Sequence, residues 1–320
     1  TNNDWDAAAA SYTLENSAPA TTLAFDPALG SAAYTANFST ASQTSYCRGF
    51  AFNNDGTKLY LIGNPYPVGV IYQYSLSTPY SIATASYDSV SFNLATQDSQ
   101  PFCVQFKTDG TKMYIVGITG DAVYQYSLSS AWDLSTVSYD SVSFSLSSQD
   151  GNMQGFVFNN DGTKFFTAGF NTFKLFEYDL STAWDMSTAS YSTQDYSISS
   201  EDSNPLGIAF NADGTVLFMI GSTNDKIFEY TLSSAFDLST ISYSGTSFSV
   251  ATQGTTPVGL AFSADRLKMY VSDRIADTIS QYAMGTLLAL GTGSFASTDV
   301  GKTINVNSGV LVLTATDGSY

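Results

Sequence analysis

Short runs of alternating apolar and polar residues recur along most of the chain, separated by turn residues. The run KLYLIG at Lys58–Gly63 follows an Asp-Gly pair and precedes a second run, VIYQYSLS at Val70–Ser77. Enrichment in Val, Ile, Tyr and Phe with local alternation is typical of half-buried strands. Asp-Gly is a strong hairpin signal, because Gly tolerates a positive φ and Asp can bond its own backbone. The pattern predicts short strands joined by tight turns.

This pattern returns five times. The phrase FNNDGTK stands at Phe52–Lys58 and unchanged at 158–164, and related phrases begin at Phe106, Phe210 and Phe262, so that the phenylalanines are 54, 52, 52 and 52 residues apart. Self-similarity at a fixed period identifies a repeat architecture. The pattern predicts four strands in each complete unit, which in the first unit cover 49–52, 58–63, 70–77 and 85–94. Four strands in each of five units are typical of the blades of a β-propeller.

The fifth unit lacks its fourth strand. Its first three strands begin at Gly259, Lys268 and Thr278, and the repeat is lost beyond Gly285. The missing strand lies near the N-terminus, at Ala32–Gln43. Pairing the first and last segments removes an open sheet edge that would otherwise invite aggregation. We therefore predict an all-β fold, a five-bladed β-propeller of four-stranded antiparallel blades, closed by an N-terminal strand in the last blade.

The limits of the repeat divide the chain into three predicted parts. Residues 1–31 form an N-terminal extension, residues 32–284 form the propeller, and residues 285–320 form a C-terminal β segment that begins a further module. The extension contains DWDAAAASY at Asp4–Tyr12, an imperfect copy of the sequence at Ala131–Tyr139.

Composition excludes several function classes. The chain has 320 residues, of which 43% are hydrophobic and 12% charged, and a net charge of −17. An acidic surface does not suit the neutralisation of nucleic-acid phosphates or docking on anionic lipid. No apolar run approaches the roughly 20 residues of a membrane-spanning helix. We therefore expect no nucleic-acid partner and no membrane insertion.

Histidine and cysteine narrow the chemistry further. The chain has no histidine, which excludes Ser-His-Asp and Cys-His catalysis and zinc sites that contain histidine. The two cysteines, Cys47 and Cys103, are too few for a disulfide framework. We favour two free core thiols over a bridge.

Two resemblances accompany this pattern. The segments PVGLAFSADRLKMYVSD at Pro257–Asp273 and PLGIAFNADGTVLFMIG at Pro205–Gly221 resemble the YVTN-type propeller repeat, over about 250 residues of the chain. This resemblance implies the fold and not an activity. The segment at Phe295–Tyr320 and the YQYSLSTAWD type of repeat are similar to phage tail-fibre and other virion-associated proteins. They imply a virion or extracellular appendage, with a parent chain that continues past Tyr320.

The loops between the third and fourth strands supply candidate ligand-binding residues. Each loop offers an aromatic residue, and three place an aspartate beside it. A ring that stacks on the apolar face of a sugar, next to a carboxylate and hydroxyls, is a common way to hold carbohydrate. The predicted ligand-binding residues are Tyr80, Trp132, Asp133, Trp184, Asp185, Phe236 and Asp237.

Two alternatives remain for these loops. In the first, which we favour, the aromatics pack against neighbouring blades and the aspartates begin turns. In the second the aspartates bind Ca²⁺, although no dense D-x-D-x-D-G loop is present. We predict no cofactor and no metal site.

The opposite face would carry Asp98, Asp150 and Asp202. Some five-bladed propellers are glycosidases with carboxylates at the channel mouth, but catalytic carboxylates should be unequal, whereas these obey the repeat. We expect a structural role for them. The innermost strands break the repeat at Arg48, Gln105 and Gln154, which are not an acid–base set.

These observations lead to a prediction of function. We predict that the chain is not an enzyme but a virion- or cell-surface module for adhesion or display. Its partners would be surface glycans or a host receptor, and neighbouring virion subunits. The alternatives are a glycan-degrading propeller enzyme and a purely architectural virion subunit.

Overall fold

The computed structural model describes residues 29–63, 69–284, 303–306 and 309–312, the last two ranges by their backbone. The chain divides into two compact units. One is Ala28–Met284, and the other combines Thr1–Pro27 with Gly285–Tyr320. The predicted copy of the repeat at Asp4–Tyr12 lies outside the described residues.

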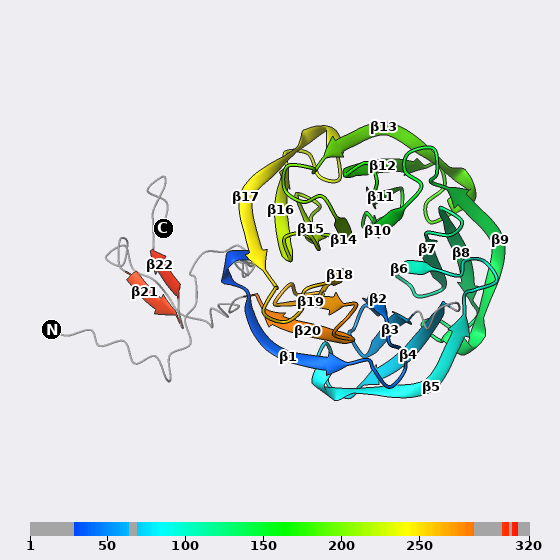
Figure 1. Cartoon of the computed structure of the whole chain (residues 1–320), viewed down its shortest axis with the longest axis horizontal. Coiled ribbons are helices and arrows are strands. Elements are labelled where there is room, and N and C mark those ends of the chain that lie inside the picture. Colours follow the sequence, from blue (N-terminus) through cyan, green and yellow to red (C-terminus); the bar gives the residue numbers. More distant parts are fainter. Residues whose placement is uncertain (1–28, 64–68, 285–302, 307–308, 313–320) are drawn as a thin grey trace, which may run out of the picture. The chain divides into compact units, whose positions relative to one another are not determined.

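The unit Ala28–Met284 is a ring of five four-stranded antiparallel sheets, as Figure 1 shows. The first blade contains β2 (Cys47–Phe52), β3 (Lys58–Gly63), β4 (Val70–Leu76) and β5 (Ala85–Asn93). The next three contain β6 (Pro101–Phe106), β7 (Lys112–Gly117), β8 (Ala122–Leu128) and β9 (Val137–Ser145); β10 (Met153–Phe158), β11 (Lys164–Gly169), β12 (Lys174–Leu180) and β13 (Ala189–Ser197); and β14 (Pro205–Phe210), β15 (Val216–Gly221), β16 (Lys226–Leu232) and β17 (Ile241–Ser249). The predicted all-β, five-bladed fold is confirmed.

The last blade is completed from the other end of the propeller sequence. It contains β18 (Pro257–Phe262), β19 (Lys268–Asp273), β20 (Thr278–Ala283) and β1 (Ala33–Ser39), with β1 antiparallel to β20. Phe38 lies opposite Ile279 in this pairing. The strand is shorter than predicted because a turn follows it, in which Gln43 N donates to Thr40 O at 3.0 Å. Ring closure by the N-terminal strand is confirmed.

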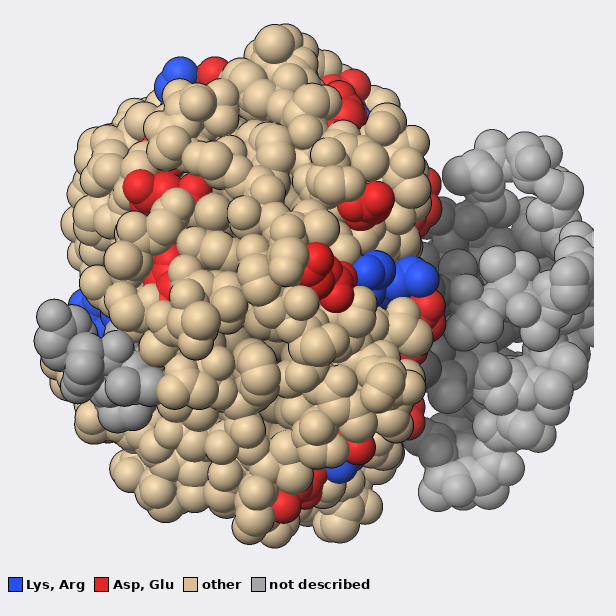
Figure 2. Space-filling view, turned by 90° about the vertical axis from the view of Figure 1, so that its right-hand side faces the viewer, with Lys and Arg blue, Asp and Glu red and all other residues tan. Residues whose placement is uncertain are grey.

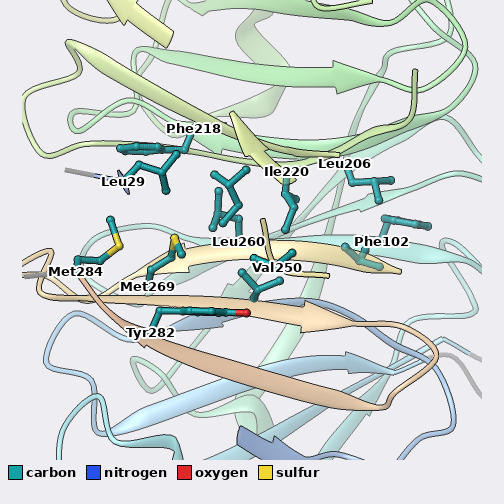
Figure 3. Close-up of a cluster of buried hydrophobic side chains, with 13 residues drawn as sticks. Leu29, Phe102, Leu206, Phe218, Ile220, Val250, Leu260, Met269, Tyr282 and Met284 are labelled. Carbon is teal, nitrogen blue, oxygen red and sulfur yellow. The ribbon is translucent and has the colours of Figure 1, made fainter. Parts of the chain in front are cut away.

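The propeller unit begins before the predicted boundary at residue 32. The short 3₁₀ helix η1 (Leu29–Ser31) places Leu29, which is completely buried, in a cluster with Phe218 and Met284 (Figure 3). Ser31 Oγ also donates to Met284 O at 3.0 Å. These contacts tie the start of the unit to its end.

Apolar packing lies mainly between neighbouring blades. Tyr60 on β3 is fully buried and its ring lies 4.4 Å from that of Phe106 on β6, in the next blade. The innermost strands approach closely at glycines: a Cβ atom at Gly207 would lie 2.8 Å from Val258 O of the following blade. Each blade therefore depends on its neighbours for its core.

The second unit contains a two-stranded hairpin, β21 (Thr303–Val306) and β22 (Gly309–Val312), paired antiparallel. A C-terminal β segment was predicted here, and its continuation into a further module stays a prediction. Within the described residues, no helix has the length and apolar character that a membrane crossing requires.

Both cysteines are free, as predicted. Cys47 is completely buried on β2, and Cys103 lies on β6. Burial raises the pKa of each thiol to about 12, so both stay protonated at physiological pH.

Candidate functional site

The propeller has two faces. We call one the turn face: it carries the tight turn between the first two strands of each blade (53–57 in the first) and the loop between the third and fourth strands (77–84 in the first). Tyr80 N donates to Gly56 O at 2.9 Å, which shows that these two segments meet on one side. We call the opposite side the clamp face, formed by the loops 94–100 and 117–122 and their counterparts.

The predicted aromatic residues of the turn face pack between blades. Trp132 has a φ of 66°, and a Cβ atom at Gly110 would lie 2.3 Å from its ring. Its ring stacks on Tyr60 of the preceding blade, and its carbonyl accepts a hydrogen bond from Tyr60 Oη at 2.5 Å. Trp184 is only 9% exposed, and Phe236 lies 4.9 Å from Phe210. These rings therefore pack against other side chains of the hydrophobic core.

The aspartates beside these rings begin short 3₁₀ helices. Asp133 Oδ1 accepts hydrogen bonds from Ser135 N at 2.9 Å and Ser135 Oγ at 2.7 Å, and these bonds lower the pKa of Asp133. Asp185 and Asp237 make the same contacts in their blades. A structural role is thus established for all these residues, and their ligand-binding role stays a prediction.

Two of the predicted residues also border open space between blades. Trp132 and Asp133 line a groove of about 590 Å³ together with Lys58 and Asp88. The charges in this groove are already paired, because Lys58 Nζ and Asp88 Oδ2 lie 2.8 Å apart. The groove therefore offers few unused polar groups.

A better candidate lies on the propeller axis. A pocket of about 430 Å³, here called the axial pocket, opens on the turn face and is lined by residues from all five blades. It includes one predicted ligand-binding residue, Tyr80, whose hydroxyl donates to Asn54 O at 2.7 Å. The other lining residues are Phe50, Ala51, Phe52, Asn53, Asn54, Gln105, Val157, Phe158, Asn160, Ile208, Ala209, Phe210, Asn211, Ala212, Leu260, Ala261, Phe262, Ser263, Ala264 and Arg266.

One side chain of the wall breaks the repeat. The residue before the repeated phenylalanine is Ala51, Val157, Ala209 or Ala261 in four blades and Gln105 in the remaining blade. No hydrogen bond from the Gln105 amide to another described residue is found, whereas Gln73 and Gln125 bond Leu134 N and Met186 N. Gln105 thus places an unused donor and acceptor at a position where the other four blades have Ala or Val.

The axial pocket is blind. Deeper between the innermost strands, the free space shrinks to a cavity of about 10 Å³. Four residues, Phe50, Gln105, Ile208 and Leu260, line both spaces and form the floor of the pocket. A ligand would therefore enter from the turn face.

The rim is polar. Asn160 Nδ2 donates to Ala212 O of the next blade at 2.7 Å, and Asn54 Nδ2 donates to Thr108 O in the same way. Both residues are exposed. Arg266 adds a positive charge, with its guanidinium 5.0 Å from the centre of the Phe262 ring. The sequence signal for this site is the FNNDGTK phrase itself, together with the break at Gln105.

The aspartates of the clamp face hold loops. Asp98 is 2% exposed and accepts backbone hydrogen bonds from Gln100 at 2.7 Å and Gly120 at 2.8 Å. Asp150 and Asp202 bond their loops equivalently. The last blade has Gly254 at this position. There Asp273 from β19 holds the loop instead, because it accepts a hydrogen bond from Thr256 N at 2.7 Å. The predicted structural role is confirmed for these residues.

One further clamp-face aspartate, Asp225, is expected to lower the stability of the fold when it is ionised. Asp225 has a φ of 50° and a buried Oδ1 without a partner, and burial together with Asp273 and Asp202 raises its pKa. A raised pKa means that the ionised form costs stability above the folded pKa, and that this cost disappears below the unfolded value. We expect Asp225→Asn to stabilise the chain at pH 7 by about 0.5 kcal/mol, and to bring no gain at pH 3. Urea unfolding at both pH values would measure this.

Asp133→Asn is the matched control for that substitution. The pKa of Asp133 is lowered rather than raised, so the same change should destabilise the chain at pH 7. Equal effects of the two substitutions would contradict the assignment.

Metal ligands do not gather in the described part of the chain: no group of three or more Cys, Asp or Glu side chains there could hold an ion. The predictions about Ca²⁺ and cofactors stay predictions.

Comparison with known proteins gives the fold and little more. No family model matches the chain, and no curated protein matches it. Among solved structures, a functionally unknown protein from Desulfotomaculum acetoxidans is 12% identical, with a TM-score of 0.49 over 78% of this chain and 74% of that one. A candidate 6-phosphogluconolactonase from Bacteroides uniformis is 15% identical (TM-score 0.47; 76% and 68% covered). The periplasmic gluconolactonase PpgL of Pseudomonas aeruginosa is also 15% identical (TM-score 0.44; 73% and 65% covered).

These names correct the prediction that the chain is not an enzyme. Propellers similar to this chain include proteins named as lactonases, so the exclusion of catalysis from the regularity of the repeat was wrong. At these identities the likeness shows the fold alone and assigns no reaction to this chain. The finer resemblance to phage tail-fibre proteins stays a prediction.

Proposed function

We propose that this propeller binds an uncharged, polyhydroxylated ligand, a saccharide or a sugar derivative, in the axial pocket. The observation that carries the proposal is the unpaired amide of Gln105 in a pocket that residues of all five blades line. A pocket in which several polar groups converge beside apolar and aromatic side chains can hold a small ligand.

The lining suits the two sides of a sugar. Phe52 and Phe262 are partly exposed and offer ring surface to apolar C–H groups. Gln105 and the rim amide oxygens of Asn54 and Asn160 offer hydrogen bonds to hydroxyls. Most of the side of the molecule shown in Figure 2 carries no charged residues.

The wider setting extends the proposal. A saccharide site on an exposed propeller face would serve attachment to surface glycans, in a virion appendage or on a cell surface. The polar, weakly charged composition supports this setting.

Hydrolysis of the bound sugar derivative is a second candidate. The names of similar propellers suggest lactones as the first substrates to assay. The lining residues of the axial pocket include no Asp or Glu, so a two-carboxylate glycosidase mechanism has no residues there. Hydrolysis of a sugar lactone by the wild type and by Gln105→Val is therefore a more informative assay than hydrolysis of a glycoside.

Replacing Gln105 tests the proposal. Gln105→Val introduces the residue that the third blade has at this position, so the fold should be intact. We expect a saccharide found by array screening to bind about fivefold more weakly, since one hydrogen bond is worth about 1 kcal/mol. Isothermal titration calorimetry would measure the affinity.

Gln154→Val is the control, because Gln154 lies outside the axial pocket and bonds Asn152 Oδ1 at 2.8 Å. Equal binding by the wild type and Gln105→Val, or failure of every saccharide to bind, would overturn the proposal.

A further inference from the structure

We propose that Arg48 and Arg274 form a binding site for an oxyanion, a carboxylate or phosphate group of a ligand, on the clamp face. This site is separate from the axial pocket and does not rest on the proposed function.

The fold brings the two arginines together from distant parts of the chain. Arg48 lies near the start of β2 in the first blade, and Arg274 directly follows β19 in the last blade. Ser272, two residues before Arg274, donates through Oγ to Arg48 O at 2.6 Å. Ring closure therefore places both side chains near the same clamp-face loops.

The Arg48 guanidinium is held in place without being saturated. Arg48 is only 7% exposed, and its guanidinium lies 4.5 Å from the centre of the Phe102 ring. One nitrogen, Nη1, donates to Pro101 O at 3.3 Å. The buried Nε atoms of both Arg48 and Arg274 have no hydrogen-bond partner. A rigid, partly unpaired guanidinium is preorganised to donate to a ligand.

Neither charge is neutralised within the described residues. All ion pairs found there involve lysine, and no carboxylate oxygen lies within 4.0 Å of either guanidinium. The nearby carboxylates are occupied: Asp98 by Gln100 N and Gly120 N, and Asp273 by Thr256 N and Ala276 N. Burial and the charge of Arg274 lower the pKa of Arg48 to about 10, against an opposing effect of Asp98, so Arg48 stays charged at neutral pH.

The unpaired state of this pair points to an anion. The chain has 28 acidic and 11 basic residues, so partners for arginine are abundant, yet no carboxylate pairs with either guanidinium in the described part of the chain. A buried charge without a counter-ion is costly, and a planar guanidinium fork matches the oxygens of a carboxylate or phosphate. An oxyanion between the two side chains would satisfy both.

The test uses the full chain in low-salt buffer, titrated by calorimetry with inorganic phosphate and with glucuronate, and with glucose as the uncharged control. We expect saturable binding of at least one anion that Arg274→Gln weakens, whereas any glucose bound in the axial pocket should bind this variant and the wild type equally. The phosphate and glucuronate arms show which oxyanion the site takes.

The variants are Arg48→Gln and Arg274→Gln, each expected to weaken anion binding at least about tenfold. Lys226→Gln removes a charge from the same face and should leave the affinity unchanged. Arg274 is partly exposed, so its variant keeps the test decisive if Arg48→Gln does not fold. Absence of binding by both anions at about 10 mM, or binding that Arg274→Gln leaves intact, would overturn the proposal.

Discussion

Removal of residues 1–39 is expected to abolish cooperative folding of the propeller. This truncation removes β1, which pairs with β20 along Ala33–Ser39, and Phe38, whose ring lies 5.4 Å from Tyr74 of the first blade. It also removes Leu29 from the core between the last two blades. The loss should be on the order of 5 kcal/mol or more, comparable with the whole stability of a domain, and the bare edge of β20 should promote aggregation.

The matched control is removal of residues 1–27, which lie outside the compact unit Ala28–Met284. Thermal unfolding followed by circular dichroism, with size-exclusion chromatography, would compare the two truncated proteins. The shorter deletion should keep the melting temperature within a few degrees of the full chain. A monomeric, fully folded protein without residues 1–39 would contradict ring closure by β1.

Glu177→Ala is expected to have the largest effect of any single substitution considered, about 3–5 kcal/mol. Glu177 on β12 is 2% exposed and joins two partners. One oxygen accepts from Lys164 Nζ, and Oε2 accepts from Leu238 N of the next blade at 2.9 Å. Alanine would leave a buried N–H without a partner and Lys164 without its main counter-ion. Urea unfolding at pH 7 would measure the change.

Glu177→Gln separates the two contributions. The first blade has Gln73 at this position, and it accepts from Leu134 N at 2.9 Å, so glutamine should keep the contact between blades. Only the ion pair would be lost, at a cost of about 1–2 kcal/mol.

The pH dependence of that loss has a definite sign. Partial burial lowers the pKa of Lys164, but Glu177 and Asp179 outweigh it, and the folded pKa is raised. Going up from neutral pH, the stabilisation by the pair is therefore complete to about pH 10 and is lost as pH rises through the folded pKa of Lys164. A larger loss of stability for Glu177→Gln than for Glu177→Ala would contradict the two roles given to Glu177.

The architecture was predictable because the repeat is nearly complete at each level. Turn residues, strand patterns and the orphan strand near Phe38 all indicate one closed ring, and the structure confirms it. The Glu177 position shows what periodicity hides: the acid that pairs with lysine sits at Asp88 on the fourth strand of the first blade, but on the third strand in the third blade. Both blades therefore keep a lysine–carboxylate ion pair, although the carboxylate comes from a different strand in each.

The candidate site was less predictable, because side-chain direction decides it. Trp132 and Asp133 have the composition of a sugar site, yet a left-handed backbone turns the ring onto Gly110 and the carboxylate caps a helix. Gln105 was recognised as a break in the repeat, but only the structure shows that it lines the axial pocket. The pairing of Arg48 with Arg274 depends on ring closure across most of the chain.

The most direct test of the central claim is a crystal structure of the propeller with a saccharide that binds it in solution. We predict density in the axial pocket, within hydrogen-bonding distance of the Gln105 amide and against the ring of Phe52 or Phe262. Density on the outer loops at Trp132 and Asp133, with the axial pocket empty, would contradict the account.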